Sequence, residues 1–130
     1  MSDFIKSMAV SASGMQAHAS RLRVSSENIA NSNTPGYRRK VLPFEQMVDR
    51  DLGASLVKTG RLNLDQSELT KMYDPSHPMA DAEGYFQGSN VNSIIEIADA
   101  REAHRSYEAN LKMFDQARQM STSLLELLRR

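Results

Sequence analysis

The stretch ENIANSNTPGYRRK, residues 27–40, decides how the rest of the chain is interpreted. The sequence before it has the pattern of one long helix. Within it, asparagines precede a Thr34-Pro35-Gly36 break, and Tyr37 and a short basic run follow. A helix end requires only a glycine or a proline. The stretch carries many more polar groups than that, which indicates contacts beyond those of an ordinary helix end.

The chain before this stretch repeats in sevens. One heptad position holds Met1, Met8, Met15, Leu22 and Ile29, and the position four residues later holds Ile5, Ala12 and Ala19. This narrow apolar strip, the N-terminal strip, is typical of a helix that packs against other helices. We predict a helix over about residues 3–31, roughly 43 Å long. Its serines and Gly14 lower its helix propensity, so we expect it to be ordered only when partners cover the strip.

A second apolar strip, the C-terminal strip, runs along the last part of the chain. It comprises Ala100, Ala103, Tyr107, Asn110, Phe114, Ala117, Ser121, Leu124 and Leu128, and Met113, Met120 and Leu127 widen it. Ser93 and Glu96 fit a capping box, which predicts a helix over residues 93–129, roughly 55 Å long. A compact body of this chain length does not cover such a helix. Asn110 either fixes the register of bundled helices or turns toward solvent.

The middle of the chain has a different character, with prolines and short extended patterns. Residues 57–64 predict an extended or hairpin segment, and residues 69–73 predict a further strand. Residues 73–78, which contain two prolines, predict a rigid turn. Residues 83–90 are expected to form a loop that leads into the C-terminal helix. An irregular middle between two long helices is unusual for a compact domain and favours an insert that contacts neighbouring molecules.

These patterns predict a mainly α fold. Two long terminal helices pack as an antiparallel coiled-coil-like pair, with a small irregular or β middle segment. The expected divisions are residues 1–36 for the N-terminal helix and Asn-rich motif, 37–92 for the extended or β-hairpin insert, and 93–130 for the C-terminal helix.

Composition argues against several classes of function. The 16 cations balance the 16 anions, whereas a general nucleic-acid binder has a net basic surface. The sequence lacks both a long apolar run that would span a membrane and the pattern of a secretory signal. Cysteine is absent, which removes disulfides, thiolate catalysis and cysteine-based zinc sites. The short basic run at residues 38–40 is expected to be a solvated or intersubunit patch.

The histidines and acidic residues do not form a convincing catalytic pattern. His104 and Glu108 are four residues apart, which favours a surface pair over an acid–base dyad. Asp74, His77, Asp81 and Glu83 are an alternative metal-ligating set, but their spacing is unrecognised and a rigid turn is the favoured interpretation. No nucleophile elbow appears. We therefore expect no enzymatic activity, no cofactor and no metal.

Residues 28–37, NIANSNTPGY, resemble the N-I-A-N-x-x-T-P-G-Y signature of the axial proteins of the bacterial flagellum, the rod, hook and hook-associated subunits. Every fixed position of that signature is present. Further motifs at residues 73–78, 82–85, 90–92 and 105–110, together with the short chain, resemble the proximal-rod members of the family. The resemblance covers the whole chain and is thin over residues 41–70. Ser76 departs from the glycine that the family usually has.

The resemblance implies a structural subunit of the proximal rod of the flagellar basal body. Such a subunit polymerises through its terminal helices into the shaft that transmits motor torque for motility. The implied partners are copies of itself, other rod subunits, the basal-body adaptor and the type III export apparatus, without nucleic acid or membrane insertion. The implied location is the rod, in the periplasm. The alternatives are a soluble helical interaction module and another rod-family subunit.

The expected contact residues come from the resemblance for the rod motif and from the heptad spacing for the two strips. For the rod motif they are Asn28, Ile29, Asn31, Asn33, Thr34, Pro35, Gly36 and Tyr37, and for the helix strips they are Met8, Met15, Leu22, Tyr107, Asn110, Phe114, Leu124 and Leu128. Within the motif, Pro35 ends the helix, Gly36 permits a sharp exit and the Tyr37 hydroxyl is expected to reach a polar partner. The residues alone leave simple helix capping as the alternative role.

Overall fold

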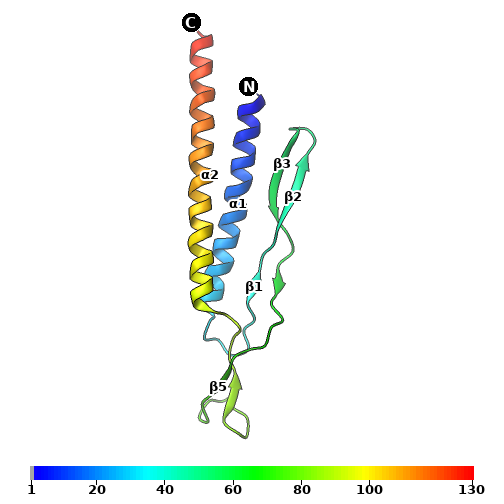
Figure 1. Ribbon diagram of the computed structural model, residues 1–130, viewed down its shortest axis with the longest axis vertical. Helices are drawn as coiled ribbons and strands as arrows, with labels where there is room; N and C mark the ends of the chain where they lie inside the picture. Colours follow the sequence, from blue (N-terminus) through cyan, green and yellow to red (C-terminus); the bar gives the residue numbers. More distant parts are fainter. Residues whose placement is uncertain (1) are drawn as a thin grey trace.

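The computed structural model of the chain describes residues 2–130, with the side chain of Ser2 excepted. Met1, the first position of the N-terminal strip, lies outside the described residues. Two helices dominate the chain, α1 over Ser2–Ala30 and α2 over Ser93–Leu128. They run side by side in opposite directions, so that both termini lie at the same end of the molecule (Figure 1). The prediction of an antiparallel helix pair with a small β middle segment is confirmed.

The first turn of α2 differs from the predicted capping box. The N-cap residue is Asn92, whose Oδ1 accepts hydrogen bonds from Ile94 N and Ile95 N at 3.1 and 3.4 Å. Asparagine and serine are both good N-cap residues, so the sequence alone did not separate Asn92 from Ser93. Glu96 does not fold back to cap the helix, because its side chain contacts Arg39 instead.

The middle segment forms three short antiparallel strand pairs. They are β1 (Lys40–Val41) with β4 (Asn63–Leu64), β2 (Phe44–Asp49) with β3 (Ala54–Thr59), and β5 (Lys71–Tyr73) with β6 (Tyr85–Gln87). Strands were predicted near residues 57–64 and 69–73, but their partners β1, β2 and β6 were not. The expected loop at residues 83–90 is wrong at β6, which pairs with β5 over its whole length.

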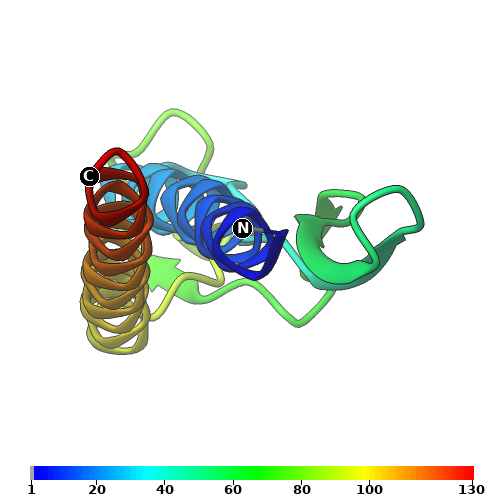
Figure 2. The ribbon, with the colours of Figure 1, turned by 90° about the horizontal axis from the view of Figure 1, so that it is seen from above.

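The helices and the β2–β3 hairpin form three adjacent layers, with α1 between α2 and the hairpin (Figure 2). The hairpin is joined to α1 by a hydrogen bond from Val57 N to Ser13 Oγ, 3.1 Å long. Phe44 packs edge-on against His18 with 5.1 Å between ring centroids, and the Arg21 guanidinium lies 3.6 Å over the same ring. The hairpin therefore packs against polar side chains of α1.

Small residues line the contact between α1 and α2. The buried apolar side chains are Ala17, Val24, Ala103 and Ala117. A Cβ added to Gly14 would lie only 2.8 Å from Asn110 Oδ1, so the two backbones approach closely at this point. Asn110 thus faces α1 rather than solvent, and its Nδ2 donates to Ser106 O at 2.9 Å. Small interface residues permit a close approach but bury little apolar surface.

The two predicted strips occupy different positions in this pair. Members of the C-terminal strip face α1, with Ala103 and Ala117 buried and Tyr107, Asn110, Phe114 and Leu124 half-buried. The most buried face of α1 instead carries Ser11, Gly14, Ala17, Val24, Ser25 and Asn28. Met8, Met15 and Leu22 of the N-terminal strip are half-buried at the flank, and Ile5 is 48% exposed. Large methionines do not fit where the helices approach most closely.

Candidate functional site

The Asn-rich motif leaves α1 through a series of tight turns. Thr34 N donates to Asn31 O at 3.0 Å, and Tyr37 N donates to Thr34 O at 3.2 Å. Gly36 then adopts a φ of 76°, a left-handed conformation that glycine adopts without steric cost. Its N–H lies 3.0 Å from Gly88 O and 3.2 Å from Gln87 O. The motif is thereby attached to the end of β6, which lies far away in the sequence.

Asn28 is the centre of the motif, and only 1% of its surface is exposed. Its Oδ1 accepts hydrogen bonds from the Tyr37 hydroxyl at 2.8 Å and from Lys40 N at 2.9 Å. Its Nδ2 donates to Lys40 O at 2.9 Å. An amide can both donate and accept, so Asn28 binds the backbone of residue 40 as a neighbouring strand would. The expected polar partner of Tyr37 is therefore Asn28.

The Tyr37 hydroxyl is kept in its donor form. Burial raises the pKa of Tyr37, and the carboxylates of Glu27 and Glu96 raise it further, while Lys40 acts in the opposite direction. A protonated phenol is the form that donates to Asn28 Oδ1.

Asn31 and Thr34 make contacts within the turn that ends α1. Asn31 Nδ2 donates to Glu27 O at 2.8 Å and its Oδ1 accepts from Thr34 Oγ1 at 3.1 Å, which is the capping role that the residues alone suggested. Asn33, Thr34 and Gly36 are exposed, whereas Ile29 and Pro35 are half-buried.

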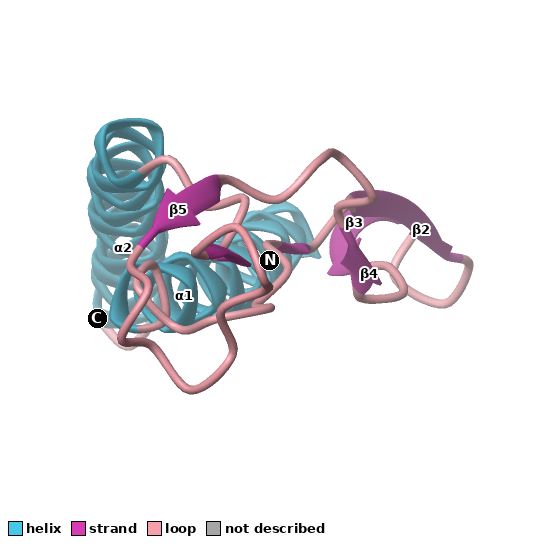
Figure 3. Ribbon diagram, turned by 90° about the horizontal axis from the view of Figure 1, so that it is seen from below, coloured by secondary structure: helices cyan, strands magenta, loops and turns pink. Residues whose placement is uncertain are grey.

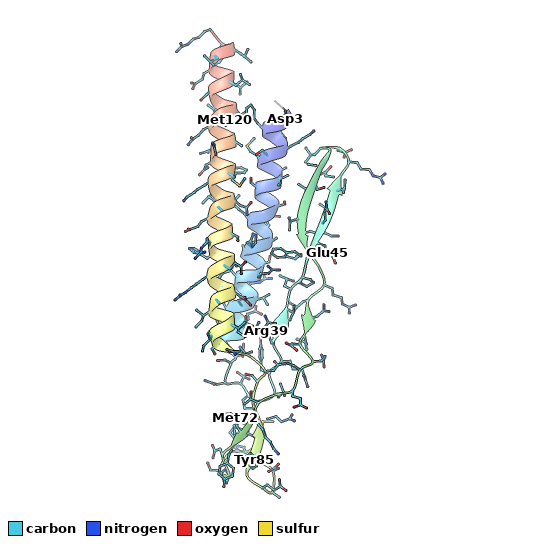
Figure 4. All side chains as sticks on the ribbon, viewed as in Figure 1. Asp3, Arg39, Glu45, Met72, Tyr85 and Met120 are labelled. Atoms are coloured by element: carbon cyan, nitrogen blue, oxygen red, sulfur yellow. The ribbon has the colours of Figure 1, made fainter. Side chains whose placement is uncertain are left out.

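Arg39 lies at the point where the middle segment meets the helix pair (Figure 4). Its Nε donates to Glu96 Oε1, and its Nη2 lies 3.4 Å from Asp99 Oδ2. Its Nη1 lies 3.9 Å from Asp65 Oδ2. Glu96 is only 1% exposed, so this carboxylate depends on Arg39 for its counter-charge. Sequence reasoning missed this contact, because its two partners are 57 residues apart.

The charge of Arg39 is maintained by its surroundings. Burial alone would lower the pKa of Arg39, but the hydrogen bond and charge of Glu96, with Asp99 and Asp65, outweigh burial and raise it. The run at residues 38–40 was expected to be a solvated or intersubunit patch. Solvation is wrong for Arg39, whose side chain is 26% exposed and contacts three carboxylates, whereas an intersubunit role of the run stays a prediction. A guanidinium with several donors in a fixed plane suits such a shared position.

Asn90 connects the segment after α1 to the chain near residue 65. Its Oδ1 accepts from Arg39 N at 2.6 Å, and its Nδ2 donates to Asp65 O at 2.9 Å. We call the set Asn28, Tyr37, Arg39, Asn90 and Glu96 the junction. Its hydrogen bonds connect the end of α1, the segment after α1, the chain near residue 65 and the start of α2.

A cavity of about 240 Å³ lies beside the junction, between α1, α2 and residues 39–42. His18 and Arg21 line it from α1, and Glu102 lines it from α2. Burial lowers the pKa of His18, and the charge of Arg21 adds to this, while Glu102 opposes it. In residues 2–130 no three His, Asp or Glu side chains are grouped closely enough to hold a metal ion. This holds for His77, Asp74, Asp81 and Glu83 too, which the described fold does not group in that way.

The His104–Glu108 pair forms as predicted on the surface, with 3.1 Å between Nε2 and Oε1. Neither described helix has an apolar stretch of the length needed to cross a membrane.

Two family models match the chain. One described as "Flagella basal body rod protein" matches residues 8–38, which include the Asn-rich motif. The other, described as "Flagellar basal body rod FlgEFG protein C-terminal", matches residues 82–127. The two matches correspond to α1 with its exit turn and to β6 with α2.

Curated relatives extend this likeness over nearly the whole chain. The "Flagellar basal-body rod protein FlgC" of Agrobacterium fabrum is 42% identical over 127 residues, covering 92% of this chain and 91% of that protein. The proteins of the same name from Bacillus subtilis and Salmonella typhimurium are 32% and 28% identical, and the alignments cover 93% and 91% of this chain and 95% and 92% of those proteins. The chain belongs to the FlgC family of flagellar basal-body rod proteins.

Proposed function

We propose that the chain is a structural subunit of the proximal rod, which assembles with copies of itself and with other rod subunits through its terminal helices. The observation that carries this proposal is the large apolar surface that one copy leaves uncovered along α2. The exposed side chains are Ile94, Ile95, Ile97, Leu111, Met113, Met120, Leu125, Leu127 and Leu128. Among them, Met113, Met120 and Leu127 recur every seven residues and so lie along one side of the helix, and an exposed apolar stripe of this kind marks an interaction site.

The junction suits a subunit that must transmit torque. A shaft resists torsion when its interior is close-packed, because such interiors have low compressibility. Within one subunit, Asn28 and Arg39 attach the middle segment to the helix pair through buried polar contacts. Load on the middle segment would therefore reach the helices without passing through a loose hinge.

We propose that the residues of the rod motif have two roles. Asn28 is buried within its own chain and acts by fixing the exit of the chain from α1. Asn33, Thr34 and Gly36 are exposed, and we propose that these positions contact neighbouring subunits. For the helix strips, we propose that Met8, Met15 and Leu22 are completed by neighbours, because they lie at the flank of the pair.

We further propose that the chain has no enzymatic activity, resides in the rod within the periplasm, and arrives there as an unfolded chain through the type III export apparatus. The rod proteins that it resembles support this proposal. The buried apolar core of four small side chains, Ala17, Val24, Ala103 and Ala117, also supports it, because a small core costs little to unfold.

A complementation experiment tests the assembly role. A strain that lacks the gene should regain basal bodies and swimming with the full chain, but not with Met113→Glu/Met120→Glu, which puts two charges on exposed apolar positions. Gln116→Glu/Gln119→Glu is the matched control, because it adds the same charge at exposed polar positions of the same helix. Full swimming with the methionine variant would contradict assembly through this face.

Sedimentation separates the rod subunit from the soluble helical module. The dilute full chain should form larger species as its concentration rises, and its circular dichroism should gain helix in parallel. A fully helical monomer at every concentration would instead favour the module.

A further inference from the structure

The β2–β3 hairpin is attached to the helix pair by few contacts. It lies against α1 on the side away from α2 (Figures 2 and 3). None of residues 44–59 is buried, and Val48 is 64% exposed. A two-stranded hairpin is only marginally stable by itself in water. Its position therefore depends on a small number of side chains of α1.

The aromatic ring of Phe44, the first residue of β2, makes the main side-chain contact with α1. His18 meets this ring edge-on, with 5.1 Å between ring centroids, and the Arg21 guanidinium lies 3.6 Å from its centroid. His18 and Arg21 are three residues apart, so they lie next to each other on the helix surface. A positive charge on His18 would therefore lie beside Arg21 at the contact that holds β2.

His18 also faces the cavity beside the junction. Its Nδ1 is buried and has no hydrogen-bond partner within residues 2–130. A neutral imidazole leaves one ring nitrogen without a proton, whereas an imidazolium carries a donor on both nitrogens. Protonation would therefore place a buried donor where no acceptor is within reach, which disfavours the charged form while the hairpin is docked.

Charged groups approach His18 from each segment that packs around it. They are Arg21 of α1, Glu96, Asp99 and Glu102 of α2, and Arg39 and Lys40 of the segment after α1. Arg39 and Lys40 already lie beside carboxylates of their own. On the hairpin, Glu45 Oε2 lies 3.8 Å from Lys58 Nζ. Most of these charges are thus compensated by other partners.

The remaining charges, Arg21 and Glu102, act on His18 in opposite directions. Burial has the largest effect and lowers the pKa of His18, the Arg21 charge lowers it further, and Glu102 raises it. The stabilisation that the neutral ring gives is therefore complete above the ordinary pKa of 6.5 and is lost as the pH falls through the lower folded value. Acid thus favours any arrangement in which His18 is hydrated.

We propose that His18 is a pH-sensitive contact that holds the β2–β3 hairpin on α1, so that neutral His18 keeps Phe44 docked and protonated His18 releases the hairpin. The release is confined to the hairpin, because the hydrogen bonds and ion pairs of the junction do not involve His18. Acid would therefore free the outer layer of the molecule while α1 and α2 stay paired. This device belongs to the single chain and does not depend on the proposed rod function.

Distances between two spin labels test this release in the full chain. The protein has no cysteine, so introduced thiols are the only labelling sites. Gln16→Cys and Ser55→Cys, two exposed positions, report the separation of α1 and the hairpin. The labelled chain is diluted into unlabelled chain, so that only distances within one copy are measured. Between pH 7.5 and pH 5 the separated population should rise about threefold or more. An unchanged distance distribution would overturn the proposal.

A second label pair shows whether the change is confined to the hairpin. Gln16→Cys and Met113→Cys report the separation of the two helices and should give the same distances at both pH values. If the helices separate together with the hairpin, acid acts on the whole fold and the proposed local release is wrong.

Two further variants connect the response to His18. In His18→Gln the separated population should be equal at both pH values, because no group titrates at this position. Glu102→Gln keeps His18 and removes the charge that favours its protonated form in the docked chain, so it should raise the separated population at pH 6 about twofold. Glu108→Gln, the same change at an exposed position of α2, is the matched control and should have no effect. A pH response that persists in His18→Gln, or equal effects of the two glutamate variants, would overturn the proposal.

Discussion

The two ends of α1 contact the rest of the chain in opposite ways. At its C-terminal end, Asn28 is buried and hydrogen-bonded on all sides to residues 37 and 40, and Arg39 nearby neutralises the buried Glu96. Toward its N-terminus, small residues such as Gly14 and Ala17 contact α2, and Ile5 remains largely exposed. The polar junction fixes geometry inside one molecule, whereas the apolar end leaves surface for neighbours.

Breaking the ion pair of the junction should have the largest effect. Arg39→Met removes the counter-charge of a carboxylate that is 1% exposed, and a buried charge without a partner costs about 3–5 kcal/mol of unfolding free energy. Urea denaturation of the dilute chain measures this loss. Arg39→Met/Glu96→Leu should recover more than half of it, since the unpaired charge is then gone.

A surface pair provides the control for this prediction. Lys58 Nζ and Glu45 Oε2 are 3.8 Å apart with both side chains about half exposed, so Glu45→Gln should cost less than about 1 kcal/mol. If Arg39→Met costs no more than Glu45→Gln, the junction does not hold the fold as described.

Removing the Asn28 amide should lower the free energy of unfolding somewhat less than removing Arg39 does. Asn28→Ala removes three hydrogen bonds and leaves the backbone groups of Lys40 without their partner, which should cost about 2–3 kcal/mol. Asn33→Ala, an exposed asparagine of the same motif, should stay within about 0.5 kcal/mol of wild type. Thermal unfolding followed by circular dichroism compares the two, and equal losses would show that burial does not distinguish these asparagines.

The close contact between Gly14 of α1 and Asn110 of α2 should be sensitive to one added methyl group. Gly14→Ala should destabilise the chain by about 1 kcal/mol, because the new Cβ would lie 2.8 Å from Asn110 Oδ1 and the core must shift to accept it. In an Asn110→Ala background the same change should stabilise by up to about 1 kcal/mol through higher helix propensity. Urea denaturation of the wild type, Gly14→Ala, Asn110→Ala and the double variant gives the coupling free energy between the two positions. The same sign in both backgrounds would mean that Asn110 does not set the approach of the two helices.

The same contrast explains what the sequence could predict. Heptad spacing is a local signal, and it placed both helices within a residue or two of α1 and α2. Glu96 was misassigned as a cap, because its real partner Arg39 is distant in the sequence and only the fold brings them together. β1 and β4 have two residues each, which is too short for an alternating apolar and polar pattern to be recognised in the sequence. The N-terminal strip was predicted to pack against other helices, and contact with neighbouring subunits stays a prediction. Within one chain its methionines are half-buried, because small residues occupy the closest contact with α2.

The smallest expected effect concerns the Tyr37 hydroxyl at alkaline pH. Because burial and the nearby carboxylates raise its pKa in the folded chain, its contribution to stability is complete below its unfolded pKa of about 10 and is lost as the pH rises through the higher folded value. Tyr37→Phe should therefore lower stability by about 1 kcal/mol at pH 8, where the hydrogen bond to Asn28 is intact, and by less at pH 11. Urea denaturation at the two pH values measures the difference. Tyr73→Phe, an exposed tyrosine, is the control and should cost the same small amount at both. A Tyr37→Phe penalty that grows with pH would show that the phenol does not donate to Asn28 in the folded chain.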